Sequence, residues 1–116
     1  MIIHFEAEAV EIEVNDLNVL FVGFYAEENY LMIQLSLDIE DGNYHIERDD
    51  QSYGEYGGVE KINLWRDSIE VELDDNGKEN LQCDGVKVDF ETDDENYELL
   101  IEKLKFIFGN SLILKD

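Results

Sequence analysis

Most of the side chains in this sequence that could do chemistry are carboxylates. Asp and Glu supply 30 of the 116 residues, beside two histidines, His4 and His45, and one cysteine, Cys83. Adjacent carboxylates can act as general acid and base, but pairs arise by chance among so many acids. Neither histidine has a serine or cysteine motif beside it, so no nucleophile is paired with a base. We therefore expect no enzymatic activity.

The same residues give no sign of a cofactor or metal site. Two histidines and one cysteine at unrelated spacings do not form a zinc site. Gly54, Gly57 and Gly58 follow neither the dinucleotide nor the P-loop spacing. Asp41-Gly42 lacks the alternating oxygen ligands of a calcium loop. We expect neither a cofactor nor a metal.

Net charge is the strongest feature of the composition, at −22 from 30 acids and eight bases. Such a field repels phosphate backbones and anionic lipid headgroups, so binding to nucleic acid or to a membrane surface is not expected. A basic protein partner is the natural inference, and acids that merely solvate the surface are the alternative. No apolar run approaches the roughly 20 residues that span a bilayer, and the N-terminus does not resemble a signal peptide. The cytoplasm is the expected location.

Residues 47–59 stand out as a candidate partner-binding loop that interrupts a succession of strands. Residues 38–60 hold eight acids and one base, a net charge of −7. Tyrosine is a favoured interface residue, and carboxylates can accept paired hydrogen bonds from arginine. In the alternative interpretation, the glycines only shape a turn and the tyrosines cover the edge of the core. The predicted partner-binding residues are Glu47, Asp49, Asp50, Gln51, Tyr53, Glu55 and Tyr56.

The strands that would position this loop are predicted from hydrophobic alternation. Residues 3–14 alternate, with a change of phase at Ala9-Val10, which predicts two short strands joined by a bulge or bend. Every charge in residues 1–16 is negative, so this ribbon should present an unbroken acidic face. Residues 18–26 are apolar in both alternating sets, which is typical of a strand covered on both faces.

Three hairpins are predicted along the chain. Their turns are Glu28-Asn29, Asp41-Gly42 and Arg66-Asp67, of which Asp-Gly is the best short hairpin signal. Each register keeps the apolar residues of both strands on one face. His45, between Tyr44 and Ile46, is expected to point to solvent. The predicted opposing pairs are Phe24 with Ile33, Leu37 with Ile46, and Leu64 with Ile69.

Residues 74–83 have two interpretations. Asn76-Gly77 could turn directly into another strand, or residues 75–81 could make one helical turn before a strand at residues 85–90. We favour the helical turn, because a two-residue turn would set Leu73 against Asn80 and spoil the apolar face.

The clearest predicted helix follows, with Thr92 as its N-cap in the capping box Thr92-Asp93-Asp94-Glu95 and Gly109 as its end. Leu112-Ile113-Leu114 forms either a last short strand or a segment packed on the sheet. The sequence therefore predicts a single α+β domain over residues 1–116. Its core is one antiparallel, strongly twisted sheet of about six to eight strands with one long C-terminal helix packed on it. The apolar stripe of that helix is Tyr97, Leu100, Ile101, Leu104, Ile107 and Phe108.

Several short motifs follow one another in the chain. They are Tyr30-Leu31-Met32-Ile33-Gln34, Asp50-Gln51 and Tyr56-Gly57-Gly58-Val59, followed by a strand pair and the acidic-capped helix. In this order and spacing they resemble the bacterial polymorphic-toxin immunity protein family 10. The similarity covers roughly residues 3–108 and assigns no binding residues. It implies a non-enzymatic antidote that binds and blocks a cognate toxin, secreted or delivered by contact.

An acidic inhibitor of this kind could cover the basic cleft of a nuclease toxin with carboxylates where phosphates would sit. The main alternative is an acidic nucleic-acid mimic that inhibits a DNA-binding or RNA-binding protein. A third is an enzyme that uses surface carboxylates and a metal.

Overall fold

The computed structural model describes residues 1–39 and 42–116, which form two five-stranded sheets rather than one. The strands are β1 (Ile2–Glu6), β2 (Ala9–Val14), β3 (Val19–Tyr25), β4 (Tyr30–Ser36), β5 (His45–Arg48), β6 (Asp50–Tyr56), β7 (Val59–Trp65), β8 (Ser68–Leu73), β9 (Gly85–Asp89) and β10 (Leu112–Leu114). Sheet A has the order β1-β9-β8-β7-β10, and sheet B has the order β2-β3-β4-β5-β6. The helices are α1 (Asp75–Leu81), α2 (Asp94–Phe108) and the 3-10 turn η1 (Gly109–Ser111).

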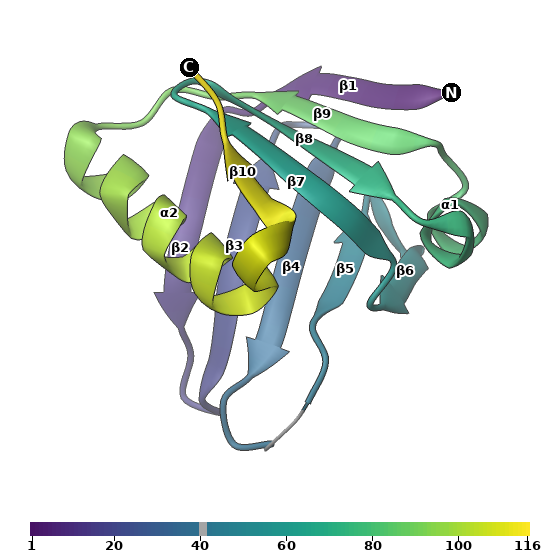
Figure 1. The fold of residues 1–116 in the computed structure, drawn as a ribbon, viewed down its shortest axis with the longest axis horizontal. Helices are drawn as coiled ribbons and strands as arrows, with labels where there is room; N and C mark the ends of the chain where they lie inside the picture. Colours follow the sequence, from purple (N-terminus) through teal and green to yellow (C-terminus); the bar gives the residue numbers. More distant parts are fainter. Residues whose placement is uncertain (40–41) are drawn as a thin grey trace.

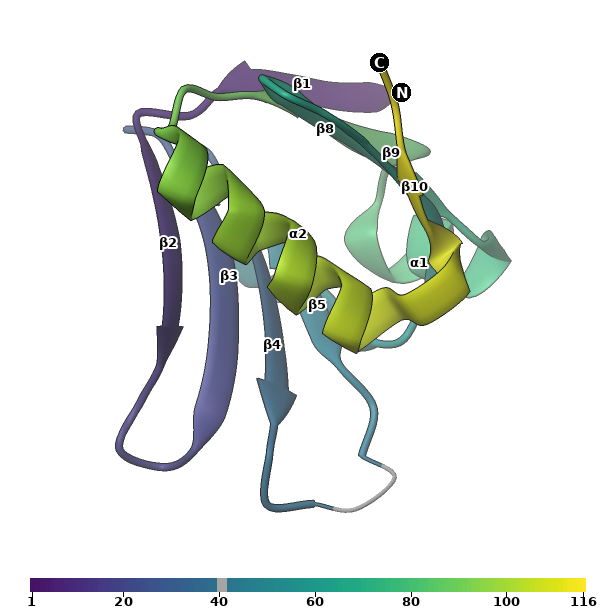
Figure 2. The same ribbon diagram turned by 60° about the vertical axis from the view of Figure 1, so that its left-hand side comes forward.

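Figures 1 and 2 show sheet A across the top of the molecule, sheet B below it and α2 along the open side between them. The inner faces of both sheets and one side of α2 share a single hydrophobic cluster. The prediction that the helix stripe packs on a sheet is confirmed, with Leu100 and Leu104 fully buried. The central side chains of the cluster include Phe24, Ile33, Ile46, Leu64, Ile69 and Val71.

The prediction of one antiparallel sheet is wrong in two respects. The chain leaves sheet A after β1 and returns to it at β7, so its consecutive strands are divided between two sheets. Sheet A is also mixed, because β1 pairs in parallel with β9 and β10 pairs in parallel with β7. The acids of residues 1–16 therefore do not form one continuous ribbon. A strand with one buried face has the same alternation in either arrangement, so the pattern could not distinguish them.

Hairpin registers are confirmed in one case and corrected in two. Leu64 lies opposite Ile69, as predicted. Phe24 lies opposite Leu31 rather than Ile33, because the turn falls at residues 27–28, one position before the predicted turn. This two-residue shift leaves every side chain on its predicted face.

The β4–β5 connection differs more from the prediction. Strand β4 ends at Ser36, and Ile46 lies opposite Ile33 rather than Leu37. The connection is therefore longer than a two-residue turn. The predicted Asp41 turn residue lies outside the described residues.

Residues 74–83 contain the helical turn that we favoured. Asp74 is the N-cap of α1, and its carboxylate accepts a hydrogen bond from the Gly77 N–H at 2.8 Å. Cys83 lies just beyond the helix, where burial raises the pKa of its thiol. This short helix lies against β6, an edge strand of sheet B.

The N-cap of α2 is Asp93, one residue later than predicted. Its carboxylate accepts from the Asn96 N–H at 2.7 Å, with the extended backbone of a capping residue. Thr92 instead offers its carbonyl oxygen to Arg66. Gly109 ends the helix as predicted, with a φ of 56° that favours glycine.

Asp93→Ala is expected to lower the free energy of unfolding by about 1 kcal/mol, because the Asn96 N–H loses its acceptor at the helix start. Thr92→Ala is the matched control and should leave stability nearly unchanged, since only the Thr92 backbone is used. Equilibrium unfolding in urea measures both. A larger loss in the Thr92 variant would contradict the assignment.

Candidate partner-binding surface

Residues 47–59 are not a long loop, contrary to the prediction. Residues 45–56 form the hairpin of β5 and β6, and Asp49 alone connects the two strands in the left-handed conformation, with φ of 63°. Gly57 and Gly58 then carry the chain from sheet B to sheet A, both with positive φ. Strand β6 carries few aliphatic side chains, and its pairing with β5 shifts register near Arg48. Its sequence therefore showed no hydrophobic alternation from which a strand could be predicted.

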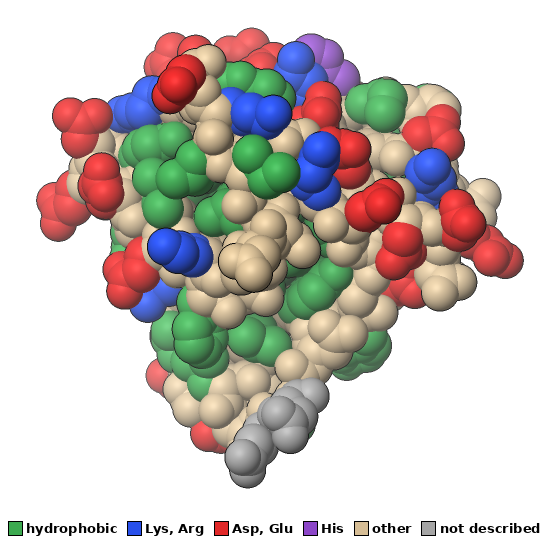
Figure 3. Space-filling model, viewed as in Figure 1, with side chains coloured by type: hydrophobic (Ala, Val, Ile, Leu, Met, Phe, Trp, Pro, Cys, Tyr) green, Lys and Arg blue, Asp and Glu red, His purple; other side chains and the backbone are tan. Residues whose placement is uncertain are grey.

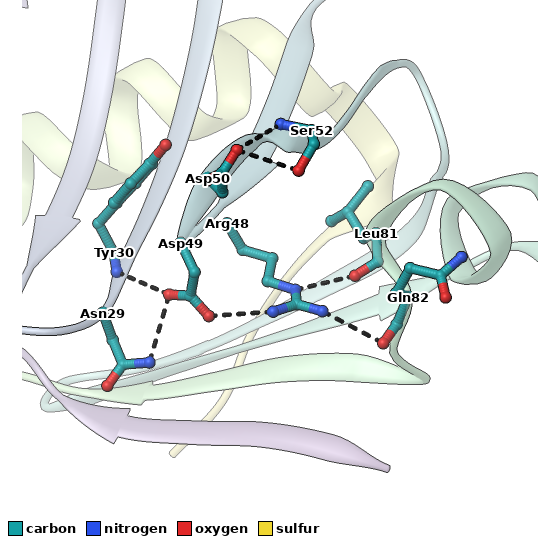
Figure 4. A network of polar contacts seen from close by, with 8 residues as sticks. All are labelled: Asn29, Tyr30, Arg48, Asp49, Asp50, Ser52, Leu81 and Gln82. Atoms are coloured by element: carbon teal, nitrogen blue, oxygen red, sulfur yellow. Dashed lines mark hydrogen bonds and ion pairs between the residues drawn. The ribbon is translucent and has the colours of Figure 1, made fainter.

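Arg48 is the residue that sequence reasoning missed. Its side chain is buried, and its guanidinium reaches the last carbonyls of α1 (Figure 4). Nε donates to the Leu81 carbonyl oxygen at 2.8 Å, and Nη2 donates to that of Gln82 at 3.2 Å. The guanidinium carbon also lies 4.1 Å from the centre of the Tyr53 ring. Arg48 therefore fixes α1 to the β5–β6 hairpin, where its charge also suits the negative end of a helix.

Two of the predicted partner-binding carboxylates are used inside the molecule. Asp49 accepts from the Tyr30 N–H at 3.0 Å and from Nη1 of Arg48 at 3.2 Å, which holds the hairpin turn against β4. Glu55 lies opposite Ile46 on the inner face of sheet B. It accepts from Nδ2 of Asn80 in α1 at 2.9 Å. Together with Tyr53 beneath Arg48, these residues shape the hairpin rather than project from it.

Glu47 lies on the outer face of sheet B but is only 6% exposed. The Tyr30 hydroxyl donates to its carboxylate, and His45 Nδ1 lies 3.7 Å from the other carboxylate oxygen. His45 was predicted to point to solvent, and this prediction is wrong. Its ring lies over Gly54 and edge-on to Tyr56, with ring centres 5.0 Å apart.

The outer face of sheet B combines aromatic rings with acids. The Tyr25 ring lies over Gly23, so β3 is covered on this side by its own side chains rather than by another layer. Burial raises the pKa of Tyr25, and the carboxylates of Glu11, Glu13 and Glu47 raise it further. These three acids therefore act on one region of the sheet.

Three of the seven predicted residues, Asp50, Gln51 and Tyr56, are fully accessible to a partner. Asp50 accepts from the backbone and side chain of Ser52, which lowers the pKa of its carboxyl group and keeps it ionised at neutral pH. Gln51 follows it on the edge strand, and Tyr56 is 72% exposed at the other end of β6. The other four predicted residues make contacts within the molecule and are at least partly buried. They are Glu47, Asp49, Tyr53 and Glu55.

Charge is unevenly divided between the two halves of the chain. Residues 1–60, which supply all of sheet B, contain 15 acids and one base, Arg48. Residues 61–116 contain the other 15 acids and the remaining seven bases. Since Arg48 is bound internally, sheet B has no Lys or Arg side chain free to offset its acids. The half of the chain that forms sheet B is therefore the more negative, with a net charge of −14 (15 acids and one base) against −8 (15 acids and seven bases) for residues 61–116.

Among residues 1–39 and 42–116, no group of three or more His, Cys, Asp and Glu side chains is arranged to hold a metal ion. No helix in this described part is long and apolar enough to cross a membrane.

Comparison with known protein families gives a match over most of the chain. The family model of immunity protein 10 matches residues 6–98, most of the chain. No curated protein and no solved structure matches it. The match confirms the resemblance drawn from the short motifs and, with it, the prediction that the protein is not an enzyme. The chain belongs to the immunity protein 10 family, which implies that it neutralises a toxin without catalysing a reaction.

Proposed function

We propose that this immunity protein neutralises its cognate toxin by placing the sheet B side over a basic surface of the toxin. The division of charge carries the proposal, because residues 1–60 hold 15 acids and a single, internally bound base. We further propose that the toxin is a nuclease and that the complex forms in the cytoplasm of the protected cell. A nuclease cleft must attract phosphates, so an inhibitor rich in carboxylates suits it.

Blockade would be both electrostatic and steric. Carboxylates occupy the positions where the toxin would bind phosphates, and the sheet excludes the substrate. Asp50, Gln51 and Tyr56 supply direct contacts. Glu47, Asp49, Tyr53 and Glu55 hold the hairpin in shape, and the three acids among them add to the field. Because the internal hydrogen bonds fix this hairpin before binding, little ordering cost remains at association.

A toxin domain found in a gene adjacent to this one is the candidate partner, and its co-expression with this chain tests the proposal. The chain should restore growth, and the purified proteins should form a complex in which nuclease activity is lost. The association rate should fall at least about tenfold between about 0.05 M and about 0.5 M NaCl, since salt screens the attraction between exposed charges. Growth rescue with a rate insensitive to salt would keep the immunity function and contradict the electrostatic mechanism. Absence of both rescue and binding would overturn the proposed function.

A further inference from the structure

Four large apolar side chains are exposed together at one end of sheet B. They lie at the end of β2, in the β2–β3 connection and in the β4–β5 connection, at the bottom of Figure 1. Their exposed fractions range from 38% to 76%. Hydrophobic atoms reach the surface in this lower part of the molecule, as Figure 3 shows. We call Val14, Leu17, Leu37 and Ile39 the apolar tip.

Hydrogen bonds hold the two connections of the apolar tip together. The Leu37 N–H donates to the Asn18 carbonyl oxygen at 2.9 Å, and Nδ2 of Asn18 donates to Asp38 at 2.8 Å. Within the first connection, Oδ1 of Asn15 accepts from the Leu17 N–H at 3.0 Å. Asn18 also takes the left-handed conformation, with φ of 58°. These bonds hold residues 15–18 against residues 37 and 38, although the side chains of the tip are left out of the core.

An exposed apolar cluster is typical of a surface that binds another protein. Next to it is a groove of about 400 Å³ whose lining includes Ile39, Gln34, His45 and Tyr56. Ile39 of the tip and Tyr56, one of the exposed residues of the proposed toxin-binding surface, both line this groove. The tip thus adjoins that surface through Ile39.

The charges around the tip indicate the kind of partner. Glu13, Asp16 and Asp38 lie beside its residues in the sequence, and residues 1–47 contain no Lys or Arg. An apolar centre with an acidic rim is complementary to a hollow lined by apolar side chains and bordered by basic ones. A second copy of this chain would bring its own acids against this rim, and like charges disfavour that contact.

We infer that the apolar tip inserts into an apolar hollow on the basic surface of the toxin and provides the main affinity of the complex. This inference rests on the proposed function. The carboxylates of sheet B steer association, and the tip slows release.

The double variant Leu17→Ser with Ile39→Ser tests the inference against the double variant Ile2→Ser with Leu114→Ser. Each removes one exposed Leu and one exposed Ile, and the control residues, both just over half exposed, lie on the edge strands of sheet A. The probe is the candidate toxin domain identified by co-expression, and calorimetry measures its dissociation constant. The tip variant should bind at least about 30-fold more weakly through faster release, and the control should change less than about threefold. Urea unfolding of both variants checks that the fold is kept.

Each outcome decides a different question. If wild-type protein neither binds nor neutralises the toxin, the proposed function fails and the inference falls with it. If wild-type protein binds and the tip variant retains that affinity within about threefold, the inference alone is overturned. A wild-type dimer in light scattering that the tip variant converts to monomer would make a second copy the occupant and would also overturn it.

Discussion

Arg48→Met is expected to lower the free energy of unfolding by about 3 kcal/mol, the largest effect on stability expected for a change in the β5–β6 hairpin. The methionine keeps much of the side-chain volume, but it leaves the Leu81 and Gln82 carbonyls without their Arg48 donor. It also removes one of the donors to the Asp49 carboxylate, which keeps the Tyr30 N–H. Buried groups without partners destabilise the folded state. Because Arg48 joins α1 to sheet B, α1 should also show faster amide hydrogen exchange. Urea unfolding and hydrogen exchange measure the two effects.

Arg66→Met is a closely matched control. Arg66 makes the same three kinds of contact as Arg48. It donates to the Thr92 carbonyl oxygen, pairs with the Asp94 carboxylate and covers the Tyr97 ring. Its side chain is 46% exposed and that of Asp94 almost fully exposed, so solvent screens the pair. Arg66→Met should therefore lower the free energy of unfolding by less than about 1 kcal/mol. If both variants lost the same free energy of unfolding, burial of the Arg48 contacts would not contribute to stability.

Periodicity alone predicted the elements whose buried face is regular. In the β7–β8 hairpin Ile62, Leu64, Ile69 and Val71 alternate with polar residues and the turn is short, so the register next to the turn followed from the sequence. The α2 stripe and the short α1 helix were likewise predicted. The division into two sheets was not, because Ile3 and Phe5 in β1 alternate with polar residues in the same way as Val10 and Ile12 in β2, although the two strands belong to different sheets.

The candidate site was predicted by residue type but not by orientation. Glu55 and Asp50 are both acids in the same strand, yet Glu55 bonds to Asn80 in α1 while Asp50 lies in solvent. Glu55 lies on the inner face of sheet B and is covered by α1, whose position depends on Arg48. The apolar tip was hidden for a similar reason, since Leu37 was assigned to a strand that ends at Ser36.

Charge reversal on the sheet B side is expected to have the largest effect on the association rate. Glu13→Lys with Asp50→Lys changes two exposed acids on sheet B, and Glu98→Lys with Glu102→Lys changes two exposed acids on α2. Both pairs change the net charge by the same amount. If the sheet B side faces a basic toxin, only the first pair places new positive charge at the interface. Association should then slow by at least about tenfold for the sheet B pair and by less than about twofold for the α2 pair.

The association rate of these two variants with the cognate toxin, measured by stopped flow at low salt, tests the central claim most directly. The expected result is a slower association rate for the sheet B variant alone. Equal slowing of both variants would mean that net charge alone matters, and greater slowing of the α2 variant would place the toxin on the opposite side of the molecule. Either of these results would contradict the assignment of sheet B as the toxin-facing side.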